Sequence, residues 1–238
     1  MVSTPSNFGT LGEAPTHPKL LDWIAADFVN NGWSLKRLHR KIMTSATYQL
    51  SSAYDASSFQ RDSDNRLLWR MSPRRMEVEA WRDSLLNLTG ELEPALGGPA
   101  FDDIFKNKRR TIYAKVSRNG DAFASDAFLR RFDFPLMRAT VASRPQSIVP
   151  QQYLFLLNSE FMVGRAKSLV TRLHAEAERD EKRIEKAYAL LYGRPPSETE
   201  QQIGLAFLAS SQRGEQELSG WEQYAQMLLS SNEFMYIR

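Results

Sequence analysis

Apolar residues recur every three or four positions along several stretches of this sequence, and this spacing is the feature that most limits its fold. Such a period places apolar side chains on one face of an α-helix, whereas a half-buried strand alternates. Leu21, Ile24 and Phe28 follow the helical period, and Ser34 is a suitable N-cap for the next helix. The sequence therefore predicts a mainly α fold, an irregular multi-helix bundle.

The middle of the chain interrupts this pattern. A Gly-Gly-Pro sequence at 97–99 marks a loop, and the alternation over Arg110–Val116 predicts one strand of a small β-hairpin. Residues 51–64 are polar and are expected to form a loop, with Asp64 capping a short helix over 67–69. We expect a single domain over residues 1–238, made of an extended lead-in (1–16), N-terminal helices (17–90), a loop-rich basic segment (91–150) and C-terminal helices (151–238).

The composition excludes several kinds of site. The 238 residues contain no cysteine, so disulfides, thiolate catalysis, cysteine-based zinc sites and covalent haem attachment are excluded. No apolar run reaches the roughly 20 residues that span a bilayer, and residues 1–10 show no apolar core of a signal peptide. The histidines His17, His39 and His174 are far apart in sequence, so we expect no local metal-binding pair.

Positive charge concentrates in one part of the chain. The formal net charge is +3, but residues 106–144 contain ten Lys or Arg and three Asp. A local positive field attracts phosphate, sulfate or carboxylate groups, and the candidate anion-binding residues are Lys108, Arg109, Arg110 and Arg144. A nucleic acid is one possible ligand, with binding that weakens steeply with salt. The other interpretation is a solvated face with internal ion pairs.

A second set of polar residues has the types that acid–base chemistry uses. Paired carboxylates can transfer protons, and a histidine or an arginine beside them can complete such a site. The candidate polar cluster consists of His17, Asp22, Arg75, Glu77, Glu79 and Arg82. Catalysis would require these residues to meet in one concave pocket. A structural ion-pair network explains the same residues, because arginine forms bidentate pairs with carboxylates.

A series of short strings along the chain resembles the domain-of-unknown-function family 1553, also called PSD1. The strings keep the order of the family and run over nearly the whole length: Thr4–Gly9, Thr16–Ala25, Gly32–His39, Thr44–Tyr48, Asp64–Arg70, Arg74–Glu77, Gly97–Pro99, Pro150–Gln152, Leu156–Asn158 and Ser230–Phe234.

The resemblance implies a molecular setting rather than a reaction. Domains of this family form the C-terminal part of large planctomycete proteins and usually follow a cytochrome-c-like region in one exported polypeptide. It implies an extracytoplasmic location, no cofactor in this chain, and haem c in an upstream domain. The expected partners are missing upstream domains of the same polypeptide or a split partner. The family offers no catalytic residues to carry over.

The family pattern also has a helical stretch before the Thr4–Gly9 string, which suggests that this sequence is truncated at its N-terminus. If a helix is missing there, Leu20, Ile24 and Leu38 lose their cover, and we expect an exposed apolar patch near the N-terminal helix pair.

Our leading functional expectation is a non-catalytic interaction or scaffold domain, because no known catalytic signature is present. The first alternative is an enzyme or binding domain that acts on anionic or polysaccharide substrates. The second is a nucleic-acid binder that uses the basic segment 106–144.

Overall fold

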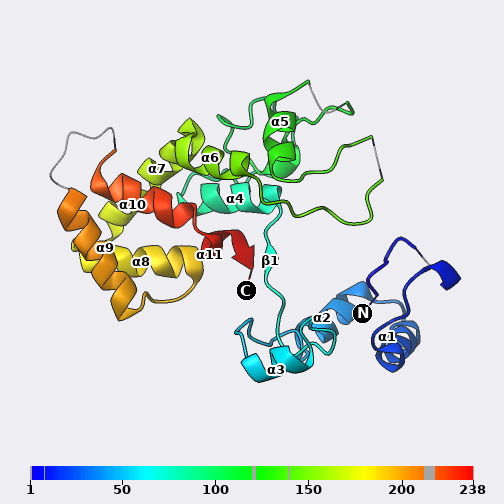
Figure 1. Cartoon of the computed structure of the whole chain (residues 1–238). Coiled ribbons are helices and arrows are strands. Elements are labelled where there is room, and N and C mark those ends of the chain that lie inside the picture. Colours follow the sequence, from blue (N-terminus) through cyan, green and yellow to red (C-terminus); the bar gives the residue numbers. More distant parts are fainter. Residues whose placement is uncertain (1, 8, 120–121, 139, 212–217, 238) are drawn as a thin grey trace. The chain divides into compact units, whose positions relative to one another are not determined.

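The computed structural model describes residues 2–7, 9–119, 122–138, 140–211 and 218–237. The prediction of a mainly α fold is confirmed, because helices dominate these residues and the strands are short (Figure 1). Residues up to Arg74 form one compact unit and Arg75–Ile237 form another, called unit 1 and unit 2 below. The expectation of a single domain stays a prediction.

Unit 1 contains a short 3-10 helix and three α-helices: η1 (Gly9–Leu11), α1 (Pro18–Asn30), α2 (Leu35–Met43) and α3 (Ala56–Arg61). Pro18 opens α1, where a proline costs no helical hydrogen bond. Ser34 caps α2 as predicted, since its hydroxyl accepts the N–H of Arg37.

Two predictions for the segment after α2 are wrong: part of the predicted loop over residues 51–64 is helical, and residues 67–69, predicted to form a helix, are not helical. Asp55 starts α3 inside the predicted loop, because its carboxylate accepts the N–H of Ser58 at 2.8 Å. The helix predicted over 67–69 does not form, and Leu68 instead has a left-handed backbone with φ 59°. There Asp62 accepts the backbone N–H groups of Arg66 and Leu67, which holds these residues in a turn.

Unit 2 contains the remaining elements: α4 (Val78–Leu88), η2 (Thr111–Tyr113), α5 (Ala124–Arg131), α6 (Pro150–Asn158), α7 (Glu160–Glu176), α8 (Asp180–Tyr192), α9 (Glu198–Ser210), α10 (Gly220–Leu229) and α11 (Asn232–Met235). The long helix α7 contacts α4, α6, α8 and α10 (Figure 1). Ser159 and Ser197 cap α7 and α9, and Gly193 ends α8 with φ 68°.

The core of unit 2 has two kinds of packing. Aliphatic residues of α7 and α8, such as Leu169, Leu173 and Ile184, are fully buried. Trp81 of α4 packs against a group of aromatic rings 4.9–6.4 Å apart between centroids, formed by Phe128, Phe132, Phe155 and Phe161. Burial of this apolar surface is the main driving force for folding of unit 2.

The small sheet lies elsewhere than predicted. It pairs β1 (Arg74–Arg75) with β2 (Tyr236–Ile237), whereas the predicted strand at Arg110–Val116 contains the 3-10 helix η2. Asp83 explains the difference, because its carboxylate accepts both the N–H (2.7 Å) and the hydroxyl (2.6 Å) of Thr111. The bond to the N–H of Thr111 satisfies a backbone group that a strand would have paired within a ladder.

Candidate functional site

Arg75, a member of the predicted polar cluster, is a buried structural clamp. Its guanidinium donates to the Asp133 carboxylate, to the carbonyl oxygen of Ser147 at 2.6 Å and to Gln152 at 3.4 Å. Burial raises the pKa of Asp133, but hydrogen bonds from Ser147 and Arg75 outweigh it and hold that pKa below its usual value. The charged pair ties the segment before α6 to the start of unit 2.

Glu77 and Glu79 meet an arginine from the predicted anion-binding set. Arg144 forms a bidentate pair with Glu79, with N–O distances of 2.7 and 2.9 Å, and lies 3.5 Å from Glu77. The hydrogen bonds to Glu79 raise the pKa of Arg144 above its usual value. Fork-to-fork pairing of this kind fixes geometry as well as charge, so both carboxylates are engaged in an ion pair.

Arg82 is completely buried and holds a loop rather than a ligand. It donates two hydrogen bonds to the carbonyl oxygen of Ile104, at 2.7 and 3.1 Å, and one each to the carbonyl oxygens of Asn107 (2.5 Å) and Arg109 (3.1 Å). Burial lowers the pKa of Arg82 to about 10, which leaves it charged at neutral pH. Its five donor hydrogens are used on the loop, including one on the hydroxyl of Thr111.

The other three predicted anion-binding residues also have partners within the chain. Lys108 lies 3.5 Å from the carboxylate of Glu91, and Arg110 lies 3.4 Å from that of Asp83. Arg109 donates to the carbonyl oxygens of Gly97 and Pro99 and stacks over Tyr113 at 4.3 Å. A carboxylate or carbonyl beside each cation reduces the field available to an external anion.

The structure divides the predicted polar cluster between the two units. His17 and Asp22 belong to unit 1, where the His17 ring bonds to the Thr16 hydroxyl at 2.9 Å and Asp22 is exposed. The other four members belong to unit 2 and contact the partners described above. No group of three His, Asp or Glu residues that could hold a metal ion occurs among the residues that the structure describes.

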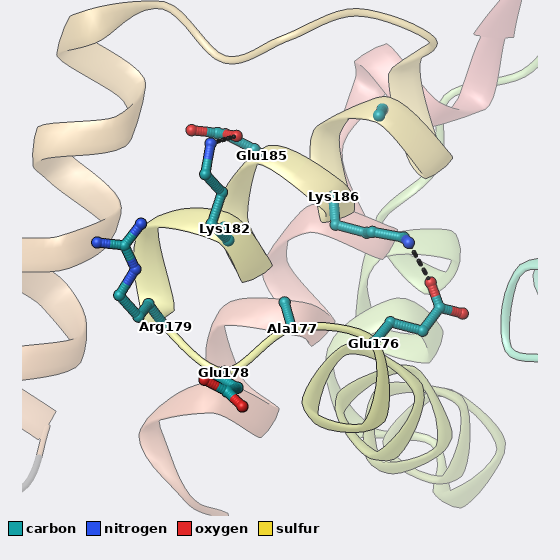
Figure 2. A pocket seen from close by; sticks show the side chains of 8 residues that line it. Glu176, Ala177, Glu178, Arg179, Lys182, Glu185 and Lys186 are labelled. Carbon is teal, nitrogen blue, oxygen red and sulfur yellow. Dashed lines mark hydrogen bonds and ion pairs between the residues drawn. The ribbon is translucent and has the colours of Figure 1, made fainter.

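An open depression of about 560 Å³ lies where α7 ends and α8 begins. Figure 2 shows its charged side chains, which come from both helices and the turn between them. Lys186 pairs with Glu176 at 2.7 Å, and Lys182 pairs with Glu185 at 2.6 Å. Because the charges of opposite sign pair with each other, this depression presents no convergent set of polar groups of the kind that fixes a small ligand.

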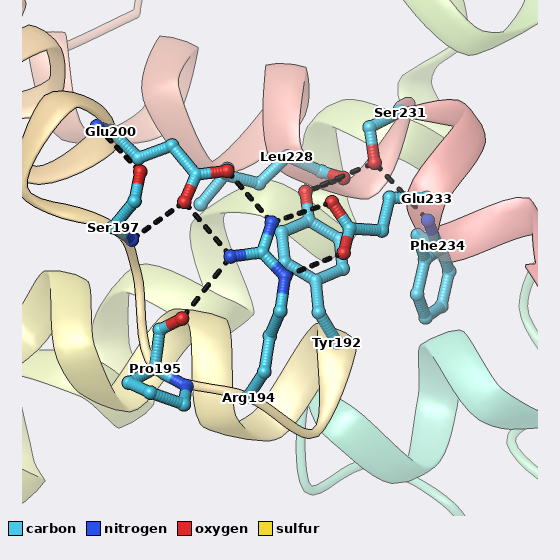
Figure 3. A network of polar contacts seen from close by, with 9 residues as sticks. All are labelled: Tyr192, Arg194, Pro195, Ser197, Glu200, Leu228, Ser231, Glu233 and Phe234. Atoms are coloured by element: carbon cyan, nitrogen blue, oxygen red, sulfur yellow. Dashed lines mark hydrogen bonds and ion pairs between the residues drawn. The ribbon is translucent and has the colours of Figure 1, made fainter. Parts of the chain in front are cut away.

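A polar network that was not predicted from the sequence joins the turn after α8 to α9 and α11. Figure 3 shows Arg194 between the carboxylates of Glu200 and Glu233, with N–O distances of 2.7–2.9 Å. The bonds to Glu200 and Glu233 raise the pKa of Arg194, and Arg194 lowers the pKa of Glu200 to about 2. Burial raises the pKa of the nearby Tyr192 to about 12. The only sequence signal was an arginine directly after the helix-ending Gly193.

Helices α1 and α2 and the turn between them expose several large apolar side chains. No described side chain of unit 1 is classed as buried, and Trp23 (54% exposed), Trp33 (66%), Leu35 (60%) and Met43 (56%) lie open to solvent. The expected exposure near the N-terminal helix pair is confirmed for Leu20, which is 41% exposed, whereas Ile24 and Leu38 are half-buried. Large apolar side chains that stay exposed in a folded unit are a feature of interaction sites.

Comparison with known protein families places the chain. The model of the family PSD1, "Protein of unknown function (DUF1553)", matches residues 1–208. The chain belongs to the DUF1553 family. The DUF1553 match covers unit 1 and continues in unit 2 into α9. No curated protein and no solved structure matches this DUF1553 chain.

Within the described residues, none of the helices combines the length and the apolarity that crossing a membrane requires.

Proposed function

We propose that this DUF1553 chain is a non-catalytic interaction domain, in which unit 2 is a rigid body and unit 1 binds a macromolecular partner. The observation that carries the proposal is the contrast in burial, because α1, α2 and the turn between them expose two tryptophans and several aliphatic side chains, and none of the described residues of unit 1 is buried. Exposed aromatic residues are the side chains that most often anchor a partner.

The polar residues of unit 2 support the same proposal. Arg75, Arg82 and Arg144 hold backbone carbonyls or carboxylates of unit 2, which is the task of structural arginines. The ion pairs of Lys108 and Arg110 likewise argue against a nucleic-acid site in the basic segment. Turnover of an anionic polysaccharide by the purified full-length chain would contradict a purely non-catalytic role.

The resemblance to the DUF1553 family extends the proposal to the cellular location and the neighbouring domains of this chain. The domain would work beside a cytochrome-c-like module in an extracytoplasmic planctomycete protein, with haem c held by that module. A partner surface supplied by the same polypeptide or by a split partner is consistent with the exposed apolar side chains of α1 and α2.

Site-specific photo-crosslinking tests the proposed function. A photoreactive phenylalanine analogue replaces Trp33 in one variant and Lys167, an exposed residue of α7, in a control variant. We expect the probe at position 33 to crosslink one discrete protein or lipid partner in the native host, and the probe at position 167 to give none. Failure of the probe at position 33 to capture any partner would contradict the proposal.

A further inference from the structure

Helix α2 separates apolar and basic side chains onto two faces. Leu35, Leu38 and Ile42 are spaced by three, four and seven residues, so they lie on one face. The basic residues of the helix occupy the rest of its circumference: Lys36, Arg37, Arg40 and Lys41. Leu35 and Ile42 are exposed although they form the apolar face, so unit 1 does not cover this face itself.

Two tryptophans extend the apolar surface beyond α2. Trp33 lies in the turn that leads into α2, and Trp23 lies on α1 with Lys41 over its ring at 4.5 Å. Trp33 has a left-handed backbone with φ 59°, which is uncommon for a bulky residue. Its N–H donates to the carbonyl oxygen of Phe28 at 3.0 Å, and its ring packs edge-on against that phenylalanine at 5.3 Å. The turn thus holds a large aromatic side chain on the outside at the expense of backbone strain.

The net charge of the α1–α2 pair indicates which kind of partner covers its exposed apolar side chains. Residues 17–44 contain five Lys or Arg against Asp22 and Asp27, a net charge of +3. Asp27 is already paired with Lys41 at 2.6 Å, whereas Lys36 and Arg40 are directed to neither carboxylate. The long stems of Lys36 and Arg40 can lie along apolar surface while their charged groups reach an anion.

We infer that the α1–α2 pair binds the surface of an anionic phospholipid bilayer. This inference rests on the proposed function and names its partner. A helix with one apolar face, a basic polar face and low mean hydropathy lies in the plane of the interface, and tryptophans prefer the headgroup level. Leu35, Ile42 and Trp33 enter the boundary between headgroups and acyl chains, and the basic side chains contact lipid phosphates.

Vesicle sedimentation of the full chain tests the inference. The probes are phosphatidylcholine vesicles with no anionic lipid and vesicles with about 30% phosphatidylglycerol, since each basic residue gains attraction only near a negative surface. We expect the chain to bind the anionic vesicles at least about tenfold more tightly than the neutral ones. Binding should weaken as salt rises, because the screening length falls to about 8 Å at physiological ionic strength.

Two variants and a matched control separate charge at α2 from charge in general. Lys36→Gln with Arg40→Gln removes two cations without placing carboxylates near the C-terminal end of the helix, where they would destabilise it. We expect this double variant to bind anionic vesicles about tenfold more weakly. Leu35→Ser with Ile42→Ser should reduce binding to a similar extent by removing two of the inserted side chains. The control Lys167→Gln with Arg179→Gln removes the same charge from exposed positions of unit 2.

The outcomes distinguish this inference from the proposed function. Equal losses in the α2 charge variant and the unit 2 control, with helix content unchanged by circular dichroism, would overturn the lipid inference. A chain that binds no anionic vesicle but crosslinks a protein through position 33 would overturn it too, and would leave the interaction domain standing. Absence of both vesicle binding and crosslinking would overturn both.

Discussion

Units 1 and 2 use the same helical signals but bury their side chains very differently. Ser34 caps α2 and Ser159 caps α7 in the same way, each accepting an N–H three residues later at 3.3 Å. Yet none of the described residues of α1, α2 or α3 is buried, whereas α7 has six buried residues. Capping and apolar spacing therefore specify a helix, but whether its apolar face is covered depends on what packs against it.

This difference leads us to expect that unit 2 carries its own stability and that unit 1 depends on a partner. Each of the following predictions compares a position in unit 2 with a counterpart in unit 1.

Arg82→Met should have the largest effect. The variant keeps most of the side-chain volume but leaves the carbonyl oxygens of Ile104, Asn107 and Arg109 without their donor, at a cost of about 3–5 kcal/mol in the free energy of unfolding. Arg40→Met in α2 should change it by less than about 0.5 kcal/mol, because that residue is exposed. Urea unfolding followed by circular dichroism measures both, and similar losses would mean that Arg82 does not support the loop.

Leu169→Ala should have the second-largest effect on stability. Leu169 is fully buried in α7, so removing three carbons leaves a cavity and costs about 3 kcal/mol in the free energy of unfolding. Leu35→Ala makes the same chemical change on the exposed face of α2 and should cost less than about 0.5 kcal/mol. Thermal and urea unfolding of the two variants give the comparison. A large loss for Leu35→Ala would show that unit 1 buries this residue when free in solution.

Glu200→Gln should have the smallest effect and a dependence on pH. The folded-state pKa of Glu200 is about 2 against an ordinary 4.5, so its ion pair with Arg194 stabilises the fold above about pH 5 and is lost as the pH falls towards 2. After allowing for solvent screening, we expect the variant to be about 1 kcal/mol less stable at pH 7 and to approach the parent near pH 2.

Asp55 provides the counterpart in unit 1. Hydrogen bonds from Ser58 and Ser57 lower its pKa to about 2, so it loses its capping charge over the same range of pH. Asp55→Asn should therefore alter the helix content of α3 and leave the unfolding midpoint of unit 2 unchanged. For Glu200→Gln, a loss of unfolding free energy that stays the same from pH 7 to pH 2 would contradict the role of the Arg194 network.

The positions of helices and caps could be predicted from the local sequence. Which residues pack around each helix could not. The spacing and the Ser34 cap predicted α1 and α2, because each signal acts within a few residues of the backbone group that it satisfies. Burial of Arg82 was not predictable, since the four residues that accept its hydrogen bonds lie 22 to 29 residues away in sequence. The missing strand at residues 110–116 has the same origin, because Asp83 captures Thr111 from a distant helix.

The candidate sites show the same limit. Glu79, Arg82 and Arg144 were candidates from the sequence for either ion pairs or ligand contacts, and the sequence could not decide between the two. Their partners are set by the tertiary fold, and each is occupied within unit 2. Exposure near the N-terminal helix pair was expected at Leu20, Ile24 and Leu38. The structure exposes Leu20 together with Leu35 and Ile42, and it leaves Ile24 and Leu38 half-buried.

The pairing of β1 with β2 has a consequence for how unit 2 is joined to other polypeptides. The N–H of Met76 donates to the carbonyl oxygen of Met235 at 2.8 Å, so the chain enters and leaves unit 2 at nearly the same point. Domains whose two ends are adjacent can be inserted into a loop of another protein without separating the ends of that loop, and they tolerate circular permutation. Tension along the backbone would likewise act first on this short pairing and spare the hydrophobic interior.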